Sequence, residues 1–552
     1  MEARRIELPN LLHAMQALYQ LSYAPAGCGQ PSKGESSFGG TRAWFGSTSS
    51  LPGGAGSRPP ATPLSVLAIL FAGAESRRSG CDLGTMAHVS RLSQDDGLWA
   101  PHRRALTIGL VTTVTIIASE ALSVVTIMPV VARDLGGLRL YGWVFSAFML
   151  ASMVGIVAAG RQADRRGPAQ PYIAGLAFFS AGLVLSGLAP TMPVLVVGRA
   201  LQGLGAGAIP AVAYVAIGRS LPDHLRPRMM AVLSTAWVLP GLFGPAISAE
   251  VARHFGWRWV FLGLLPLVLA AGPMALPALV RLGQKQAGPP SEEHRLIDAV
   301  RTAAGAGFVL AGLIADQPLV GAASVVFGVA VGLPALRRLL PAGSLRGRPG
   351  LPATILSRGL LTFAFFGSDA FVTLAITTAR HRSTTMASLA VTSATLTWTA
   401  GSWIQARLSD RTEGRHLVQV GLIAVILGIA GTASALWPPV PVVFAIASWS
   451  VAGLGMGLAY APLSLMMLRE SQAGREGWAS ASLNLSDVLG TALGVGFGGA
   501  AVAIGASTGR SLSTGISIAF TVAAVGAVAG ILVARRLPVG ATGSVSEQKV
   551  GA

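Results

Sequence analysis

The sequence predicts an all-α polytopic membrane protein, and three observations carry that prediction. The mean hydropathy is +0.60, 52% of residues are hydrophobic while only 12% are charged, and 69 residues are glycine. A soluble chain carries about 25% charged residues. Glycine is more frequent in membrane helices, where small residues let neighbouring backbones approach closely.

The helices follow from the lengths of the apolar segments, because a spanning helix needs about 20 mostly apolar residues. From residue 104 onward the chain offers fourteen such segments, separated by short polar or Gly/Pro breaks. They are 105–130, 140–160, 171–190, 192–217, 229–251, 259–280, 298–316, 318–336, 353–378, 385–405, 417–436, 440–466, 477–504 and 513–534.

A charged stretch that occurs twice divides these segments into two halves. Residues 160–167 follow the second segment, and a similar stretch at 406–411 follows the tenth, so that Asp164 and Asp410 are 246 positions apart. We expect six-helix bundles at 103–281 and 351–537, joined by a linker at 282–350 that contributes two inserted helices. A duplicated helical bundle in a membrane indicates a transporter.

The net charge of +18 is interpreted as membrane topology rather than nucleic-acid binding, because basic residues lie between the hydrophobic segments. With a cytoplasmic amino terminus, 24 Arg and Lys residues fall inside and 7 outside, and Arg358 is counted inside. This bias follows the positive-inside rule. We therefore expect a multi-pass plasma-membrane protein with both termini in the cytoplasm.

The two ends of the chain differ in composition from the membrane part. Residues 1–102 are rich in Gly, Ser and Pro and predict a disordered extension, with Met86 as a candidate true start. Residues 538–552 are expected to be a cytoplasmic tail. Both cysteines lie in the extension, so the membrane part has no thiolate metal site. We expect no cofactor or metal, no enzyme activity, and no ATP, since a Walker-type phosphate loop is absent.

The charged hairpin at 160–167 carries the first resemblance to a known family. It resembles the loop between helices two and three of the major facilitator superfamily, although Gln162 replaces the usual leucine and Pro168-Ala169 replace a basic pair. The resemblance implies a cytoplasmic gating loop that changes with conformation. The residues that carry it are Gly160, Asp164, Arg165 and Gly167, with Asp410 and Arg411 in the second copy.

The fourth segment is similar to the arginine-glutamine-glycine motif of the same superfamily, through Arg199, Gln202, Gly203 and Gly205. A cation within the hydrocarbon costs at least about 2.5 kcal/mol, so it normally faces the bundle interior and finds a partner. The resemblance links this arginine to proton coupling. The alternative is that Arg199 extends outward to the membrane surface.

The fifth segment resembles the motif of drug:proton antiporters through Pro240, Gly244 and Pro245, followed by the Trp257-Arg258-Trp259 corner. Ser248-Ala249 replace the usual closing glycine pair. Small residues allow close packing, and prolines can kink the helix. With fourteen segments, the chain from about 103 to 536 resembles the fourteen-helix branch of these antiporters.

Acidic residues inside the segments are candidates for carrying the proton. Glu120 stands nine residues before Pro129, where the family has an aspartate, while Asp369 and Asp487 lie in the ninth and thirteenth segments. Burial disfavours the charged form of a carboxyl group, as a group that loads and releases protons requires. Each acid could instead be structural or bind a cationic substrate. Four tryptophans within the segments could line a cavity or simply pack: Trp237, Trp398, Trp403 and Trp449.

The resemblance implies a proton-coupled secondary transporter that exports small lipophilic compounds or drugs by alternating access. Its expected partners are a lipophilic substrate, protons and the lipid bilayer. Two alternatives stay open: an exporter of an endogenous lipid, peptide or siderophore, and a transport-dead receptor on the same fold. Retained charges at Glu120, Arg199 and Asp164 argue against the receptor, because a fold kept only for structure has little need of buried charge.

Overall fold

The computed structural model describes residues 97–222, 225, 229, 232–233, 236–283, 293–409, 411–472, 476–507 and 511–538. Within those ranges nothing is said of a few side chains, among them that of Asp164. The chain divides into two units, Met1–Cys81 and Asp82–Ala552, and every described residue belongs to the second. The extension predicted over 1–102 and the tail predicted over 538–552 therefore lie almost wholly outside the described residues.

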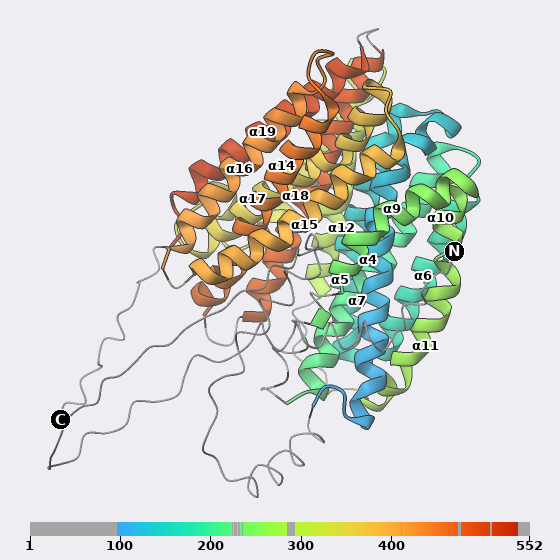
Figure 1. Ribbon diagram of the computed structural model, residues 1–552. Coiled ribbons are helices and arrows are strands. Elements are labelled where there is room, and N and C mark those ends of the chain that lie inside the picture. Colours follow the sequence, from blue (N-terminus) through green and yellow to red (C-terminus); the bar gives the residue numbers. More distant parts are fainter. Residues whose placement is uncertain are drawn as a thin grey trace, which may run out of the picture. The chain divides into compact units, whose positions relative to one another are not determined.

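The first half of the described chain is built from helices that coincide with the predicted apolar segments (Figure 1). They are α4 (Pro101–Leu135), α5 (Tyr141–Arg166), α6 (Ala169–Gly187), α7 (Met192–Ser220), α9 (Val238–His254), α10 (Arg258–Leu262) and α11 (Leu265–Arg281). A short 3-10 turn, η2 (Leu138–Leu140), joins α4 to α5. The sequence predicts the fifth helix from residue 229, whereas α9 starts at Val238.

The rest of the described chain, from residue 293 onward, is also helical. The linker holds α12 (Glu293–Leu313), α13 (Pro318–Leu339) and a short 3-10 turn, η4 (Ser344–Arg346). The second half holds α14 (Leu351–Leu374), α15 (Thr384–Leu408), α16 (Gly414–Ser434), α17 (Val442–Glu470), α18 (Glu476–Ser507) and α19 (Leu512–Ala534). A π-helical turn, η5 (Ala375–Ala379), extends α14.

The described residues confirm an all-helical membrane fold but not fourteen spans. Each of the fourteen predicted segments contains a described helix, and twelve of these helices are long and apolar enough to cross a membrane. The two that fall short are α9, which has 17 residues, and α15, which is rich in Ser and Thr. The apolar segments in the sequence therefore overstate the number of helices that are separately long and apolar enough to span a membrane.

Glycine sets the ends of the first two helices. Gly136, with φ +67°, follows α4, and Gly167, with φ +85°, follows α5. Backbone with positive φ is open to glycine and costs other residues free energy. Each of these helices therefore ends at a glycine, because the positive φ there is not helical and is unfavourable for residues with a side chain.

Each half is packed mainly within itself, and two pairs of helices make the most extensive contacts between the halves. In the first half α5 and α6 pack on α7, and α4 packs on α9 and α11; in the second half α14 packs on α18 and α19, and α15 and α16 pack on α17. Between the halves, α5 packs on α18 and α9 packs on α15. We call these two contacts the α5–α18 seam and the α9–α15 seam.

Glycines make both seams close. A methyl group on Gly142 would lie 2.7 Å from the Cα of Gly499, so the backbones of α5 and α18 touch there. In the other seam, a methyl group on Gly241 of α9 would overlap the side-chain methyl of Thr395 from α15. Small residues at these positions allow helices to approach in a bilayer.

The hairpin of α12 and α13 lies against the α5–α18 seam. Leu310 of α12 packs in one apolar cluster with Leu150 of α5 and Leu489 of α18. Near the ends of the two hairpin helices, Arg338 donates two hydrogen bonds to Asp298, with N–O distances of 2.6 and 2.9 Å. The hairpin therefore contacts both halves and is closed on itself by an ion pair.

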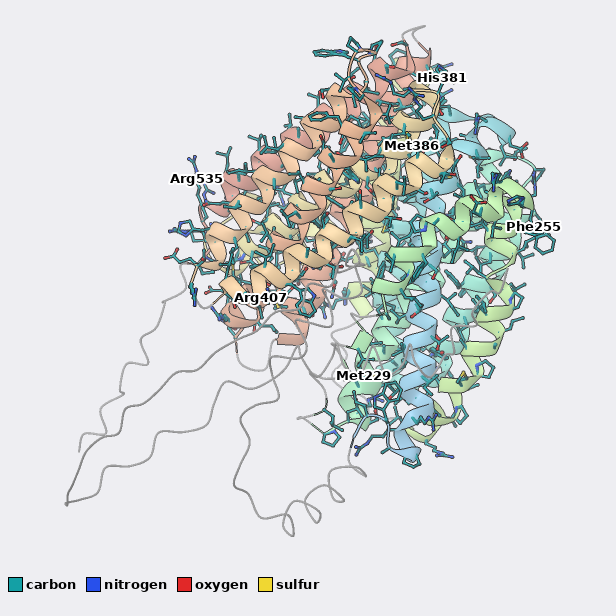
Figure 2. The ribbon with its side chains drawn as sticks, viewed as in Figure 1. Met229, Phe255, His381, Met386, Arg407 and Arg535 are labelled. Atoms are coloured by element: carbon teal, nitrogen blue, oxygen red, sulfur yellow. The ribbon has the colours of Figure 1, made fainter. Side chains whose placement is uncertain are left out.

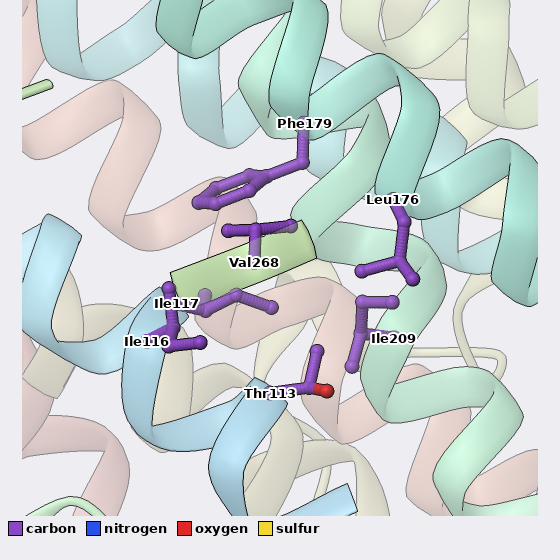
Figure 3. Close-up of a pocket in the computed structure, with 7 residues that line it drawn as sticks. All are labelled: Thr113, Ile116, Ile117, Leu176, Phe179, Ile209 and Val268. Carbon is purple, nitrogen blue, oxygen red and sulfur yellow. The ribbon is translucent and has the colours of Figure 1, made fainter. Parts of the chain in front are cut away.

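The interior of the first half also holds a small apolar gap. Figure 3 shows the seven residues that line it, contributed by α4, α6, α7 and α11. They are Thr113, Ile116, Ile117, Leu176, Phe179, Ile209 and Val268. The gap is too narrow for a water molecule, so we regard it as a packing imperfection and not as a binding site.

Candidate functional site

A buried charged cluster lies in the first half, between α4, α5 and α7. Arg199 of α7 forms an ion pair with Glu120 of α4, and both side chains are at most 3% exposed. The same guanidinium donates to Gln202 Oε1 at 2.5 Å and to the Val144 carbonyl at 3.1 Å, and it lies 4.3 Å from the centre of the Phe148 ring. Arg199 therefore faces the interior, as predicted, and does not extend to the membrane surface.

The glycines of the helix-four motif bring these helices together. A methyl group on Gly203 would overlap the carbonyl of Phe148 in α5, and one on Gly205 would overlap the carbonyl of Gly175 in α6. The two glycines thus place α7 against two neighbours at once. This approach brings Arg199 within reach of the α5 backbone and ring described above.

A second buried carboxylate lies in the second half, between α14 and α17. The indole nitrogen of Trp449 donates a hydrogen bond of 2.9 Å to Asp369 Oδ1, and the two residues are 0% and 6% exposed. The Phe365 ring stacks on Trp449, with centroids 5.1 Å apart, and meets the edge of Trp398 at 5.6 Å. Asp369 is therefore held by a neutral donor inside an aromatic group.

The two carboxylates occupy equivalent places in the duplicated fold. The first helix of each half carries the acid: Glu120 and Asp369 lie nineteen and eighteen residues after the first residues of α4 and α14. The fourth helix carries the donor: Arg199 and Trp449 each lie seven residues after the first residues of α7 and α17. One half thus pairs an acid with a cation, and the other pairs an acid with an indole.

The third predicted acid belongs to an ion pair that the sequence pattern did not indicate. Asp487 of α18 lies 3.4 Å from Arg358 of α14 and accepts a hydrogen bond of 2.8 Å from the Tyr460 hydroxyl. Arg358 is 3% exposed and donates to the Tyr460 carbonyl at 2.5 Å. Arg358, which the sequence counts among the basic residues of the cytoplasmic side, therefore lies inside the protein and is paired with an acid.

The gating-loop residues are described only in part. Asp410 and the side chain of Asp164 lie outside the described residues, so the predicted latch stays a prediction. Arg165 and Arg411 are exposed at the ends of their segments, and Gly167 takes the positive φ given above. The loop glycine therefore has a conformational role, because the backbone at Gly167 takes a positive φ.

Two of the motif glycines do not serve close packing. A methyl group on Gly160 or on Gly244 would meet no atom within 4 Å. In α9 the close contact falls on Gly241, three residues earlier. Pro240 is buried in the first turn of α9, where a missing N–H costs little, and Pro245 is buried inside the helix.

The Trp-Arg-Trp corner ties together the chain before α10. The Trp257 indole and the Arg258 guanidinium both donate to Asp134 Oδ2 at the end of α4, at 2.8 and 3.0 Å. Arg258 also lies 4.4 Å from the centre of the Trp257 ring and reaches the Ala189 carbonyl at 3.4 Å. The corner therefore fixes α4 to the chain around α10 and to the α6–α7 connection, and its role is structural.

The four tryptophans separate into two groups. Trp449 and Trp398 belong to the aromatic group around Asp369, and Trp398 also meets the edge of the Tyr460 ring at 5.4 Å. Trp237 and Trp403 are 47% and 44% exposed on the helical surface. Only the first pair has the placement that a ligand-lining role requires.

Two halves of apolar helices, each with a buried acid in its first helix, are typical of secondary membrane transporters. A sequence model of the major facilitator superfamily matches residues 108–495. The chain belongs to the major facilitator superfamily.

Relatives of known name and structures of known fold agree with this membership. The chain is 27% identical over 447 residues to a protein of Mycobacterium tuberculosis named as a probable multidrug-efflux transporter, covering 77% of this chain and 94% of that one. It is 32% identical over 187 residues to the multidrug transporter protein MdtP of Bacillus subtilis, about a third of each chain. A crystal structure of a POT family transporter in complex with 5-aminolevulinic acid matches with a TM-score of 0.60, 13% identity, and 80% and 98% coverage. That last likeness concerns the fold alone.

Proposed function

We propose that the protein is a proton-coupled antiporter that exports small lipophilic compounds by alternating access. The observation that carries the proposal is the pair of buried carboxylates, Glu120 and Asp369, in the first helix of each half. Intramembrane acids are costly and are functional by default. The multidrug names of the relatives described above support lipophilic compounds as the exported class.

The packing supports a rocking mechanism. The proposed moving bodies are the bundles at 103–281 and 351–537, with the segment at 282–350 carried between them. They meet through the α5–α18 and α9–α15 seams, both of which are lined by small side chains. Smooth, closely approaching surfaces allow one bundle to turn against the other while each keeps its own core.

The buried polar residues receive proposed roles from their surroundings. Glu120, Asp369 and Asp487 are the carboxyl groups available to protons or to a cationic substrate, and Arg199 balances the first of them. The second copy of the charged loop, with Asp410, would act with Asp164 as a cytoplasmic latch. Aromatic rings around Asp369 offer apolar contact for a lipophilic molecule.

The proposed orientation places both termini in the cytoplasm and the protein in the plasma membrane. Figure 2 shows Arg407 and Arg535 toward one end of the helices and His381 toward the opposite end. The end with the two arginines would be cytoplasmic, in keeping with the bias of basic residues in the sequence. Without the buried Arg358, basic residues of the sequence still predominate on the proposed cytoplasmic side.

Reconstitution in liposomes tests the proposal. An imposed pH gradient is followed by a lumenal pH dye while lipophilic cations and neutral drugs are added one at a time. We expect proton flux that depends on the added compound, both in the unaltered protein and in Asp316→Asn, a control at an 82% exposed position. Folded protein that gives no compound-dependent flux would refute drug antiport and favour an exporter of an endogenous lipid, peptide or siderophore.

A further inference from the structure

The buried charges of the described helices can be paired one by one, and one remains. Glu120 pairs with Arg199, Asp487 with Arg358, and Asp298 with Arg338. Asp369 is 6% exposed, and no Arg, Lys or His of the described residues lies within ion-pair distance of it. Among the deeply buried acids of the described part, Asp369 is therefore the one held without a counter-charge.

The helices packed around α14 bring no charge close to Asp369. From α17 comes the neutral Trp449 indole; from α5 comes Tyr141, whose hydroxyl donates to the Ala370 carbonyl at 3.0 Å. The acid of α4, Glu120, is already paired, as is the Asp487 of α18. The described helix α19 has no ionisable side chain between Leu512 and Ala534. The ionisable side chains of α15 and α16 are Arg407 near the end of α15 and Arg415 and His416 at the start of α16.

The nearest cations along the chain are engaged elsewhere. Arg358 lies eleven residues before Asp369, about 16 Å along a helix at 1.5 Å per residue, and is bound to Asp487. Arg380 lies eleven residues after it and donates to the carbonyls of Ala435, Pro438 and Val440. Neither guanidinium is free to neutralise the Asp369 carboxylate.

We infer that Asp369 is the group that takes up and releases the coupled proton, and that Trp449 is its positioning residue. An isolated carboxylate in an apolar site takes a proton in preference to remaining charged. The proton binds Oδ2, since Oδ1 accepts the indole bond, and it leaves to water on the other side as the carboxylate re-forms. Glu120, by contrast, stays ionised as the partner of Arg199. This inference rests on the proton coupling proposed above.

The difference between the two acids can be tested on purified protein without a substrate. Dicyclohexylcarbodiimide adds to a protonated carboxyl group in an apolar site and leaves a stable N-acylurea, which peptide mass spectrometry locates. We expect labelling at Asp369 that declines as pH rises, and none at Glu120. Labelling at Glu120 with Asp369 unmodified at every pH would overturn the inference.

A transport experiment then separates this inference from the function it rests on. In liposomes, Asp369→Asn keeps an acceptor for the indole bond but cannot exchange a proton. We expect it to lose pH-driven drug movement, down to the level of protein-free liposomes, while exchange of labelled for unlabelled drug continues. If the unaltered protein shows no pH-driven movement of drug, the proposed function itself is refuted. If Asp369→Asn shows normal pH-driven movement of drug, only the assignment of the proton to Asp369 is refuted.

Trp449→Phe tests the positioning role. The indole bond holds Oδ1 of Asp369 in place, so its loss should change how readily this carboxyl group exchanges its proton. We expect the pH midpoint of drug-linked proton release to differ from that of the unaltered protein, whereas Trp403→Phe, at an exposed position of α15, leaves it unchanged. A midpoint equal to that of the unaltered protein would show that Trp449 only packs.

Discussion

The Glu120–Arg199 pair allows a prediction about stability that can be worked from its contacts. Glu120→Gln removes the negative partner of a fully buried guanidinium. Removing one partner of a buried ion pair costs about 3–5 kcal/mol, because the remaining charge is left uncompensated. Arg199 retains Gln202, the Val144 carbonyl and the Phe148 ring, which are neutral contacts. We therefore expect the loss to lie near the lower limit, about 3 kcal/mol.

The double variant Glu120→Gln with Arg199→Gln provides the decisive comparison. It removes both charges, so it should be more stable than Glu120→Gln alone, and the coupling is then at least as large as the loss caused by Arg199→Gln alone, about 3 kcal/mol. Unfolding in detergent micelles, followed by tryptophan fluorescence, gives the four free energies of the cycle. Asp369→Asn is the matched single variant, since it leaves no buried cation and should lose far less. Strict additivity in the cycle, or equal losses for Glu120→Gln and Asp369→Asn, would refute the reasoning.

Three further predictions concern packing and the remaining polar contacts. Gly203→Ala should destabilise the protein by about 1–3 kcal/mol through overlap with a carbonyl of α5, whereas Gly244→Ala, with no atom near the added methyl, should not; thermal unfolding of the two variants compares them directly. Asp487→Asn should cost about 3–5 kcal/mol, because it leaves the buried guanidinium of Arg358 without its negative partner. A thermal unfolding midpoint within error of that of the unaltered protein would contradict this. Trp257→Phe removes a hydrogen bond to the Asp134 carboxylate. A hydrogen bond to a charged group contributes about 1.5–3 kcal/mol, and we expect a smaller loss here because the carboxylate is half exposed and keeps its ion pair with Arg258. Denaturation curves of the variant and the unaltered protein at equal pH measure this loss.

The sequence predicted the fold well because apolar length and repeated charge are local properties of the chain. It also predicted that Arg199 faces inward and needs a partner, and that Glu120 is buried; that each is the other's partner needed the structure, because they are 79 residues apart. The motif glycines show the limit of pattern reading. Gly203 and Gly205 pack closely and Gly160 and Gly244 do not, since a motif does not state which face of a helix meets a neighbour.

The second-half site was less accessible to prediction. Arg358 stands near the start of its helix, where an arginine is normally solvated, and its partner Asp487 lies 129 positions away. Trp449 was one of several tryptophans within apolar segments, and nothing local distinguishes it from Trp403. Comparing registers between the two halves could have found it, because Arg199 and Trp449 occupy the same place in their helices.

The hairpin of α12 and α13 makes the surroundings of the two seams unequal. It covers the α5–α18 seam, so acyl chains in the bilayer reach that junction only around its edges. The α9–α15 seam has no such cover among the described helices, and Phe243 of α9 and Leu396 of α15 are 49% and 48% exposed. The α9–α15 seam therefore presents apolar side chains directly to the acyl chains of the bilayer, whereas the α5–α18 seam is sheltered by the hairpin.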